Sequence, residues 1–131
     1  WIGNYGTNFF TVDVMEKMKI IHKKTNMVIA TKVKVANTFF SRLKGLMFIK
    51  RMEGFDAMLI ENTNSVHNCF VRFSIDLVFI NSEWKVVKII RNFKPWRFSW
   101  IYLKARHVVE LPAGSLSDEV EIGDLLEAQG V

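Results

Sequence analysis

Cysteine is almost missing from this chain, which has only Cys69 among its 131 residues. A lone thiol cannot form an intramolecular disulfide, and it gives no sign of an oxidising compartment. The three histidines, His22, His67 and His107, are widely separated and form neither an HxxxH nor an HExxH pair. That spacing argues against a zinc site, and we expect no metal and no other cofactor.

Long apolar runs are absent too. No stretch approaches the roughly 20 apolar residues that a membrane-spanning helix needs, and the first residues lack the basic and apolar regions of a secretory signal. We therefore predict no transmembrane segment and a cytoplasmic protein, unless an export signal precedes this sequence. The net charge of +5 fits an anionic partner, but it identifies neither that partner nor the oligomeric state.

The bulk composition is that of a globular domain, with 50% hydrophobic and 24% charged residues. A chain of this length can bury enough apolar surface to fold without a metal or a disulfide. Trp1 is not a natural initiator, whereas Met15 and Met18 directly precede the patterned region. We interpret residues 1–17 as an N-terminal extension, either a flexible arm or added sequence, and residues 18–131 as a single domain.

Short strand signals dominate this domain. Apolar residues alternate from Met27 to Val35, which predicts one strand with one solvated face. Ile75–Ile80 and Lys85–Ile90 are apolar on both faces, so we place them in the core as two strands of a hairpin. Further strands are predicted over Lys19–His22, Ala57–Ile60, Arg106–Leu111 and Leu125–Ala128.

Two short helical segments complete the prediction. Asn37 or Thr38 can cap a short helix, and Gly45 lies where that helix would end. Ser115–Glu119 is predicted to form a second helical turn. Many short strands with two short helices favour an α+β, β-rich fold: a single compact, barrel- or sandwich-like antiparallel or mixed sheet.

Four sequence blocks follow one another at spacings that are together specific. They are an Arg-x-x-Gly-Leu-Met block at Arg42–Met47, a His- and aromatic-rich segment at His67–Phe79, Glu-Leu-Pro-Ala-Gly at Glu110–Gly114, and Gly123-Asp124. In this order they resemble the family called domain of unknown function 192, over about residues 18–128. The resemblance implies a small β-rich domain with a barrel-like core and short helices, and it implies no established activity.

The chain departs from the pattern of that family near His67. Asn68, Cys69 and Val71 stand where many relatives carry other residues, and Thr63 stands where some relatives carry a cysteine. Thiol chemistry proposed for such relatives would therefore not carry over to this chain.

His67 and Cys69 are candidates for nucleophilic catalysis. On an extended segment, side chains two residues apart point to the same face. A neighbouring histidine can lower the pKa of a thiol and make it a nucleophile. We favour the alternative, a buried cysteine acting as a small hydrophobe beside a histidine bonded to the backbone, because no third catalytic group is identifiable.

Asp76 and Glu110 each lie within an apolar strand. A buried carboxylate needs partners, and Arg42 and Arg72 are the candidates because guanidinium groups can hold carboxylates with two parallel hydrogen bonds. We therefore predict a structural network of these four residues. The alternative is a small anionic or carbohydrate-like site with Asp76 and Glu110 as catalytic acid and base.

The segment 93–106 alternates basic and aromatic residues. If exposed, it would offer anchors for a protein partner, stacking platforms for single-stranded nucleic acid or an anchor at a membrane surface. The alternative is a loop folded over one end of the core, with only its basic groups in water. The predicted binding residues are Trp96, Arg97, Phe98, Trp100, Tyr102 and Lys104.

These observations favour a non-enzymatic binding or interaction module that uses the segment 93–106, because no catalytic set is complete. The alternative is a small-ligand binder or hydrolase-like enzyme with a site around His67, Cys69, Arg72 and Asp76. Nucleic-acid binding is a weaker third hypothesis, since no RNP-type or helix-turn-helix motif supports it.

Overall fold

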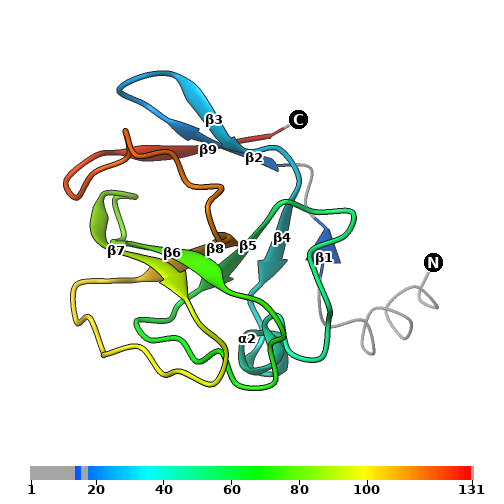
Figure 1. Cartoon of the computed structure of the whole chain (residues 1–131). Coiled ribbons are helices and arrows are strands. Elements are labelled where there is room, and N and C mark those ends of the chain that lie inside the picture. Colours follow the sequence, from blue (N-terminus) through cyan, green and yellow to red (C-terminus); the bar gives the residue numbers. More distant parts are fainter. Residues whose placement is uncertain (1–13, 16–17, 131) are drawn as a thin grey trace, which may run out of the picture.

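Nine strands in two sheets and one short helix make up the part of the chain that the computed structural model describes, residues 14–15 and 18–130 (Figure 1). The larger sheet has the order β1-β4-β5-β8-β6-β7 and the smaller one the order β3-β2-β9. Only β4 and β5 pair in parallel. The elements are β1 (Val14–Met15), β2 (Met18–His22), β3 (Met27–Ala30), β4 (Val33–Ala36), α2 (Phe39–Lys44), β5 (Ala57–Glu61), β6 (Ile75–Ile80), β7 (Val86–Phe93), β8 (His107–Pro112) and β9 (Leu126–Gly130).

The predicted β-rich class is confirmed, but the sheets do not close into a barrel. Of the two arrangements predicted, the barrel is wrong, and the chain forms two layers. Most residues of the predicted N-terminal extension lie outside the described part of the chain, while β1 pairs with β4. No helix in the described residues is long and apolar enough to span a bilayer.

The larger sheet is buried on both faces, as the apolar pattern of its central strands predicts. All six residues of β6 are buried. Val78 and Ile80 face the smaller sheet in one apolar cluster, and Leu77 and Phe79 contribute to a second cluster on the opposite face. This second cluster lies beneath the loops and the helix, and it forms the floor of the candidate site.

The strand predicted from Met27 to Val35 is in fact two strands in different sheets, β3 and β4. The chain breaks at Thr31 and Lys32, whose backbone N–H groups each donate to the Asp56 carboxylate at 2.8 Å. Asp56 comes from a loop far along the chain, so the alternation of apolar residues could not reveal this break.

The predicted helix α2 begins after the N-cap Thr38, whose hydroxyl accepts from the Ser41 N–H. In turn, the backbone N–H of Thr38 donates to the Ser41 hydroxyl at 2.9 Å, which completes a capping box. Ser41 is the one buried residue of this helix. Phe39 and Leu43 are exposed, although their spacing places them on one face of the helix.

The second predicted helix, Ser115–Glu119, is wrong: these residues form turns. Side chains from other strands take the backbone groups that a helix would pair. Asp76 accepts from the Leu116 N–H at 3.2 Å, and Arg91 donates to the carbonyls of Leu116 and Ser117 at 2.7 and 3.0 Å.

The segments 62–74 and 93–106 run side by side along the lower edge of Figure 1. Backbone hydrogen bonds join them: Asn68 donates to Arg97, Trp96 donates to Asn68, and Tyr102 donates to Asn64, all at 2.8–2.9 Å. The buried side-chain amide of Asn68 adds bonds to the carbonyls of Phe73 and Phe93. The segment 93–106 is therefore held in place by the main chain rather than by its own aromatic side chains.

Candidate functional site

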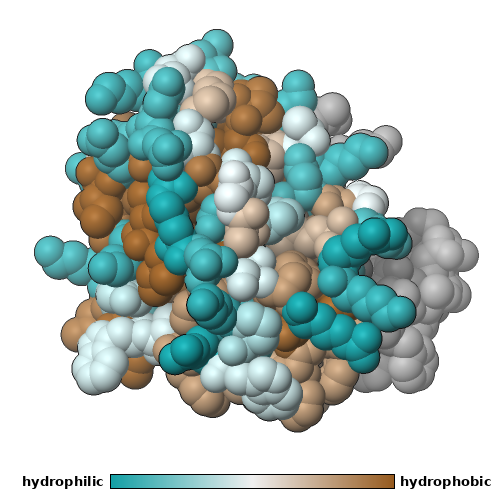
Figure 2. All heavy atoms as spheres, viewed as in Figure 1, coloured by the Kyte–Doolittle hydropathy of each residue, from teal (hydrophilic) through white to brown (hydrophobic). Residues whose placement is uncertain are grey.

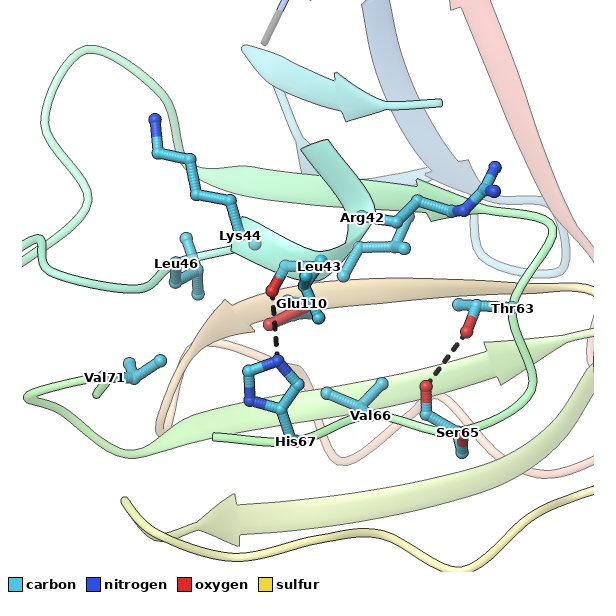
Figure 3. A pocket seen from close by; sticks show the side chains of 12 residues that line it. Arg42, Leu43, Lys44, Leu46, Thr63, Ser65, Val66, His67, Val71 and Glu110 are labelled. Carbon is cyan, nitrogen blue, oxygen red and sulfur yellow. Dashed lines mark hydrogen bonds between the residues drawn. The ribbon is translucent and has the colours of Figure 1, made fainter. Parts of the chain in front are cut away.

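A small cavity of about 40 Å³ lies where three separate segments meet (Figure 3). The helix α2 and the turn after it contribute Arg42–Leu46, the loop after β5 contributes Thr63, Ser65 and His67, and β8 contributes Glu110. Three of the four sequence blocks thus converge on one cavity, which we call the Glu110 cavity. Sequence reasoning did not predict this convergence, because the blocks are far apart along the chain.

Glu110 is the buried charged group of this cavity. Only 2% of the surface of Glu110 is exposed, and burial raises the pKa of its carboxyl to about 8. Within the described part of the chain, the carboxyl makes no hydrogen bond and no ion pair, in contrast to the predicted pairing with an arginine. The cause of this shift is desolvation, because burial penalises the charged form of the carboxyl.

Gly45 lies beside the Glu110 carboxyl. Its φ of +46° favours glycine, and a Cβ built there would lie 3.9 Å from Glu110 Oε1 and 3.9 Å from the Ile60 side chain. The glycine that ends α2 therefore borders the cavity, and its positive φ rather than a lack of space favours glycine there.

His67 closes one side of the cavity. Its Nδ1 accepts from the backbone N–H of Cys69 at 3.2 Å, which places the proton of the neutral ring on Nε2. Nε2–H then donates to the carbonyl of Leu43 in the last turn of α2, at 3.0 Å (Figure 3). Both ring nitrogens are engaged by the backbone, so the histidine ties the loop to the helix, as the structural interpretation of His67 expected.

The two cationic side chains of α2 point away from the cavity centre in Figure 3. The Arg42 guanidinium donates to the carbonyl of Asn37 at 3.2 Å, on the helix side. Lys44 extends in the opposite direction. Besides the Glu110 carboxyl, the lining includes two hydroxyl residues, Thr63 and Ser65, and several apolar side chains, while the charged ends of Arg42 and Lys44 point away from the centre.

Asp76 lies on the other face of the sheet. It pairs with Leu111 in the strand register while Leu77 pairs with Glu110, so the two carboxylates point in opposite directions. Asp76 accepts backbone N–H bonds from Asn92, Gly114 and Leu116 at 2.9–3.2 Å. The partners of this carboxylate given by these bonds are backbone groups rather than the Arg42 or Arg72 that the sequence suggested. An acid–base pair of Asp76 and Glu110 is excluded by the same geometry.

The alternative set of His67, Cys69, Arg72 and Asp76 is not gathered in one site. Of these residues, only His67 lines the Glu110 cavity. Cys69 is half-buried and contacts His67 through its backbone N–H rather than through its thiol. Arg72 is exposed.

The segment 93–106 leaves most of its aromatic residues in solvent. Trp96, Phe98 and Trp100 are 61%, 77% and 79% exposed, and Leu103 is 86% exposed. Arg97 and Lys104 are exposed beside them. Of the predicted binding residues, Tyr102 differs: it is half-buried and packs on Phe79 with ring centroids 4.8 Å apart.

Two aromatic residues from other segments extend this area, and sequence reasoning missed them. The Phe70 ring lies 4.7 Å from Trp96 and 5.3 Å from Phe48. All three residues have positive φ, between 61° and 68°, which is rare for bulky side chains. The only signal in the sequence was their position in turn-rich segments without strand periodicity. We call Phe48, Phe70, Trp96, Phe98, Trp100 and Leu103 the aromatic surface.

Figure 2 shows one face of the molecule, in the view of Figure 1. Hydrophobic atoms gather over β7 at the left, and tan and white spheres occur along the lower edge, where residues 93–106 lie in Figure 1. The exposed part of the segment therefore lies at the edge of the molecule and combines aromatic side chains with basic ones.

Fold and cavity together define a class: a two-sheet, β-rich domain in which a helix–glycine turn, a histidine loop and a buried glutamate meet. The chain matches the family domain of unknown function 192 (DUF192), described as an uncharacterized ACR, over residues 20–128. It therefore belongs to this family, and the resemblance seen in its sequence blocks is confirmed.

Curated relatives agree with this assignment. The chain is 39% identical over 103 residues to a UPF0127 protein of Pyrococcus furiosus, covering 76% of this chain and 88% of that one. It is 32% identical to a UPF0127 protein of Pyrococcus horikoshii, covering 82% and 96%.

Two crystal structures share the fold. One is a protein of Sinorhizobium meliloti 1021, provisionally described as a transcription regulator, with a TM-score of 0.73, 26% identity and coverage of 90% of this chain and 96% of that chain. The other is a protein of unknown function from Novosphingobium aromaticivorans, with a TM-score of 0.69, 18% identity and coverage of 88% and 84%.

Proposed function

We propose that this chain is a non-enzymatic protein-binding module whose contact area is the aromatic surface. The observation that carries the proposal is the exposure of Trp96, Phe98 and Trp100 on a segment fixed by backbone hydrogen bonds. A fixed segment loses little conformational entropy on binding, and large rigid aromatic side chains dominate the energetics of protein interfaces.

Backbone strain supports a role for these residues beyond folding. Phe48, Phe70 and Trp96 hold positive φ while their rings stay in contact with one another. Such conformations cost on the order of 1–3 kcal/mol each and cluster at ligand-binding sites.

The charge of the segment indicates the chemistry of the partner. Residues 93–106 contain Lys94, Arg97, Lys104 and Arg106 and no acidic residue. The fitting partner is a protein surface with apolar pockets and acidic residues around them, because complementary charge steers association.

The test is affinity capture from a native-source lysate with the wild-type chain and with a Trp96→Ala/Trp100→Ala double variant. A partner that wild type retains after nuclease treatment and that the double variant loses supports the proposal. The matched control is Val28→Ala/Ile122→Ala, which removes two exposed apolar side chains elsewhere in the chain and should leave capture unchanged.

Two results would count against a protein-binding module. Equal capture by wild type and the tryptophan variant removes the role of the aromatic surface. Capture that disappears with nuclease, with an affinity that falls steeply as salt rises, would instead indicate a nucleic-acid partner.

A further inference from the structure

The Glu110 cavity is a second feature of the molecule, and it differs in chemistry from the aromatic surface. Its floor is a carboxyl that is almost completely buried, has no hydrogen-bond or ion-pair partner within the described part of the chain and points into the cavity (Figure 3). A carboxyl without a protein donor keeps its oxygen lone pairs available for a ligand in the cavity.

The shape of the cavity limits what can satisfy this carboxyl. A cavity of about 40 Å³ can hold a few groups of water size, since one water needs roughly 10–15 Å³ of such a volume. The space admits a –CH2–NH3+ end. The half-exposed Thr63 and Ser65 line it, and their hydroxyl oxygens can accept further hydrogen bonds.

The surrounding groups determine the sign of charge that fits. The charged or titratable groups that line the cavity besides Glu110 are Arg42, Lys44 and His67. Both ring nitrogens of His67 contact the backbone, and the charged ends of Arg42 and Lys44 point away. A metal ion does not fit the donor set, because no group of three His, Cys, Asp or Glu side chains in the described residues could hold one.

We propose that the Glu110 cavity binds the primary ammonium group of a small amine. The ammonium would pair with the Glu110 carboxylate and donate its remaining hydrogens to the hydroxyls of Thr63 and Ser65. The rest of the amine would lie at the mouth of the cavity.

This binding is linked to pH. Without a ligand, burial keeps the pKa of Glu110 at about 8, so the carboxyl is mostly protonated at neutral pH. An ammonium group pairs with the ionised form, so binding releases a proton. Affinity should then rise about tenfold for each pH unit from pH 6 towards pH 8, over which range an alkylammonium stays charged.

The experiment uses three small probes with the whole chain: ethylammonium, propionate and tetramethylammonium. Binding is followed by NMR, through the side-chain carboxyl carbon of Glu110 and the amide signals of Gly45 and His67. We expect ethylammonium to shift these signals with an affinity that increases with pH. Propionate carries the opposite charge, and tetramethylammonium has no N–H donor and is too wide, so neither should bind.

The matched variant is Glu110→Gln, which keeps the shape of the side chain and removes its charge. We expect it to bind ethylammonium at least tenfold more weakly, without pH dependence. Absence of ethylammonium binding by wild type, equal binding by the variant, preferential binding of propionate or a pH-independent affinity would each overturn the proposal. If the variant does not fold, the wild-type carboxyl titration decides, because bound ethylammonium must lower the pKa of Glu110 and an unchanged pKa refutes the site.

Discussion

Asp76 and Glu110 are two buried carboxyl groups on neighbouring strands, and they differ in the hydrogen-bond donors around them. Asp76 faces the side where the turn after β8 passes, and three backbone N–H groups bind it. Glu110 faces the helix and the histidine loop, where no described residue binds its carboxyl. The difference shows that burial of a carboxylate does not reveal its role: the hydrogen-bond donors that surround it do.

The largest expected effect comes from removing the satisfied carboxylate. Asp76→Ala leaves three backbone N–H groups without their acceptor and should lower the free energy of unfolding by roughly 3 kcal/mol or more. Urea unfolding measures this, with Asp118→Ala as the control because that carboxylate is fully exposed. A loss below about 1 kcal/mol for Asp76→Ala would mean that its bonds contribute little to stability.

Glu110→Gln should instead raise the free energy of unfolding. A carboxyl whose pKa rises from 4.5 to about 8 on folding binds more protons in the folded state between these values, so stability falls as pH rises through that window. The variant removes this cost. It should be more stable than wild type at pH 8, by at most about 5 kcal/mol, and close to wild type near pH 4.5. Urea unfolding of both proteins at pH 5 and pH 8 checks this, and a variant less stable than wild type at pH 8 would show an unrecognised partner of Glu110.

Gly45→Ala tests whether the backbone beside the Glu110 carboxyl requires glycine. The substitution forces a non-glycine residue to a φ of +46° and should destabilise the fold by about 1–3 kcal/mol. Gly123→Ala is the matched control, because it shares a positive φ but a Cβ there meets nothing within 4 Å. If the new methyl group also fills the Glu110 cavity, Gly45→Ala will lose ethylammonium binding while Gly123→Ala keeps it.

The smallest effect is expected on the aromatic surface, away from both carboxyl groups. Trp96→Ala/Trp100→Ala removes side chains that are 61% and 79% exposed. The free energy of unfolding, measured by thermal unfolding, should therefore change by no more than about 0.5 kcal/mol per substitution. A larger loss would mean that these rings stabilise the fold. Their exposure would then no longer argue for an interface.

Much of the fold could be predicted from the sequence because its signals are local. The apolar pattern of Ile75–Ile80 predicts a strand buried on both faces, and the structure has that strand with the predicted bounds. Thr38 and Gly45 mark the ends of the helix for reasons contained in a few residues. The predictions for Met27–Val35 and Ser115–Glu119 failed where distant side chains, Asp56 and Asp76, take the backbone N–H groups.

The sites were harder to predict than the strands. The basic and aromatic composition of residues 93–106 indicated a surface, but not that Phe48 and Phe70 would join it. Exposure depends on which segment lies beside another, and here backbone bonds to Asn68 place that segment. Composition therefore predicted the kind of residue at the aromatic surface, and the pairing of two loops determined its extent.

What this sequence determined by itself is the β-rich class, the central hairpin, the capped helix and the family, because each depends on short-range periodicity or on an ordered set of blocks. The tertiary structure alone decided that Asp76 receives three N–H bonds and that Glu110 is left beneath Gly45 and beside His67. The physical reason is that strand alternation assigns a side chain to a face, whereas the groups that meet it there come from segments distant in the chain.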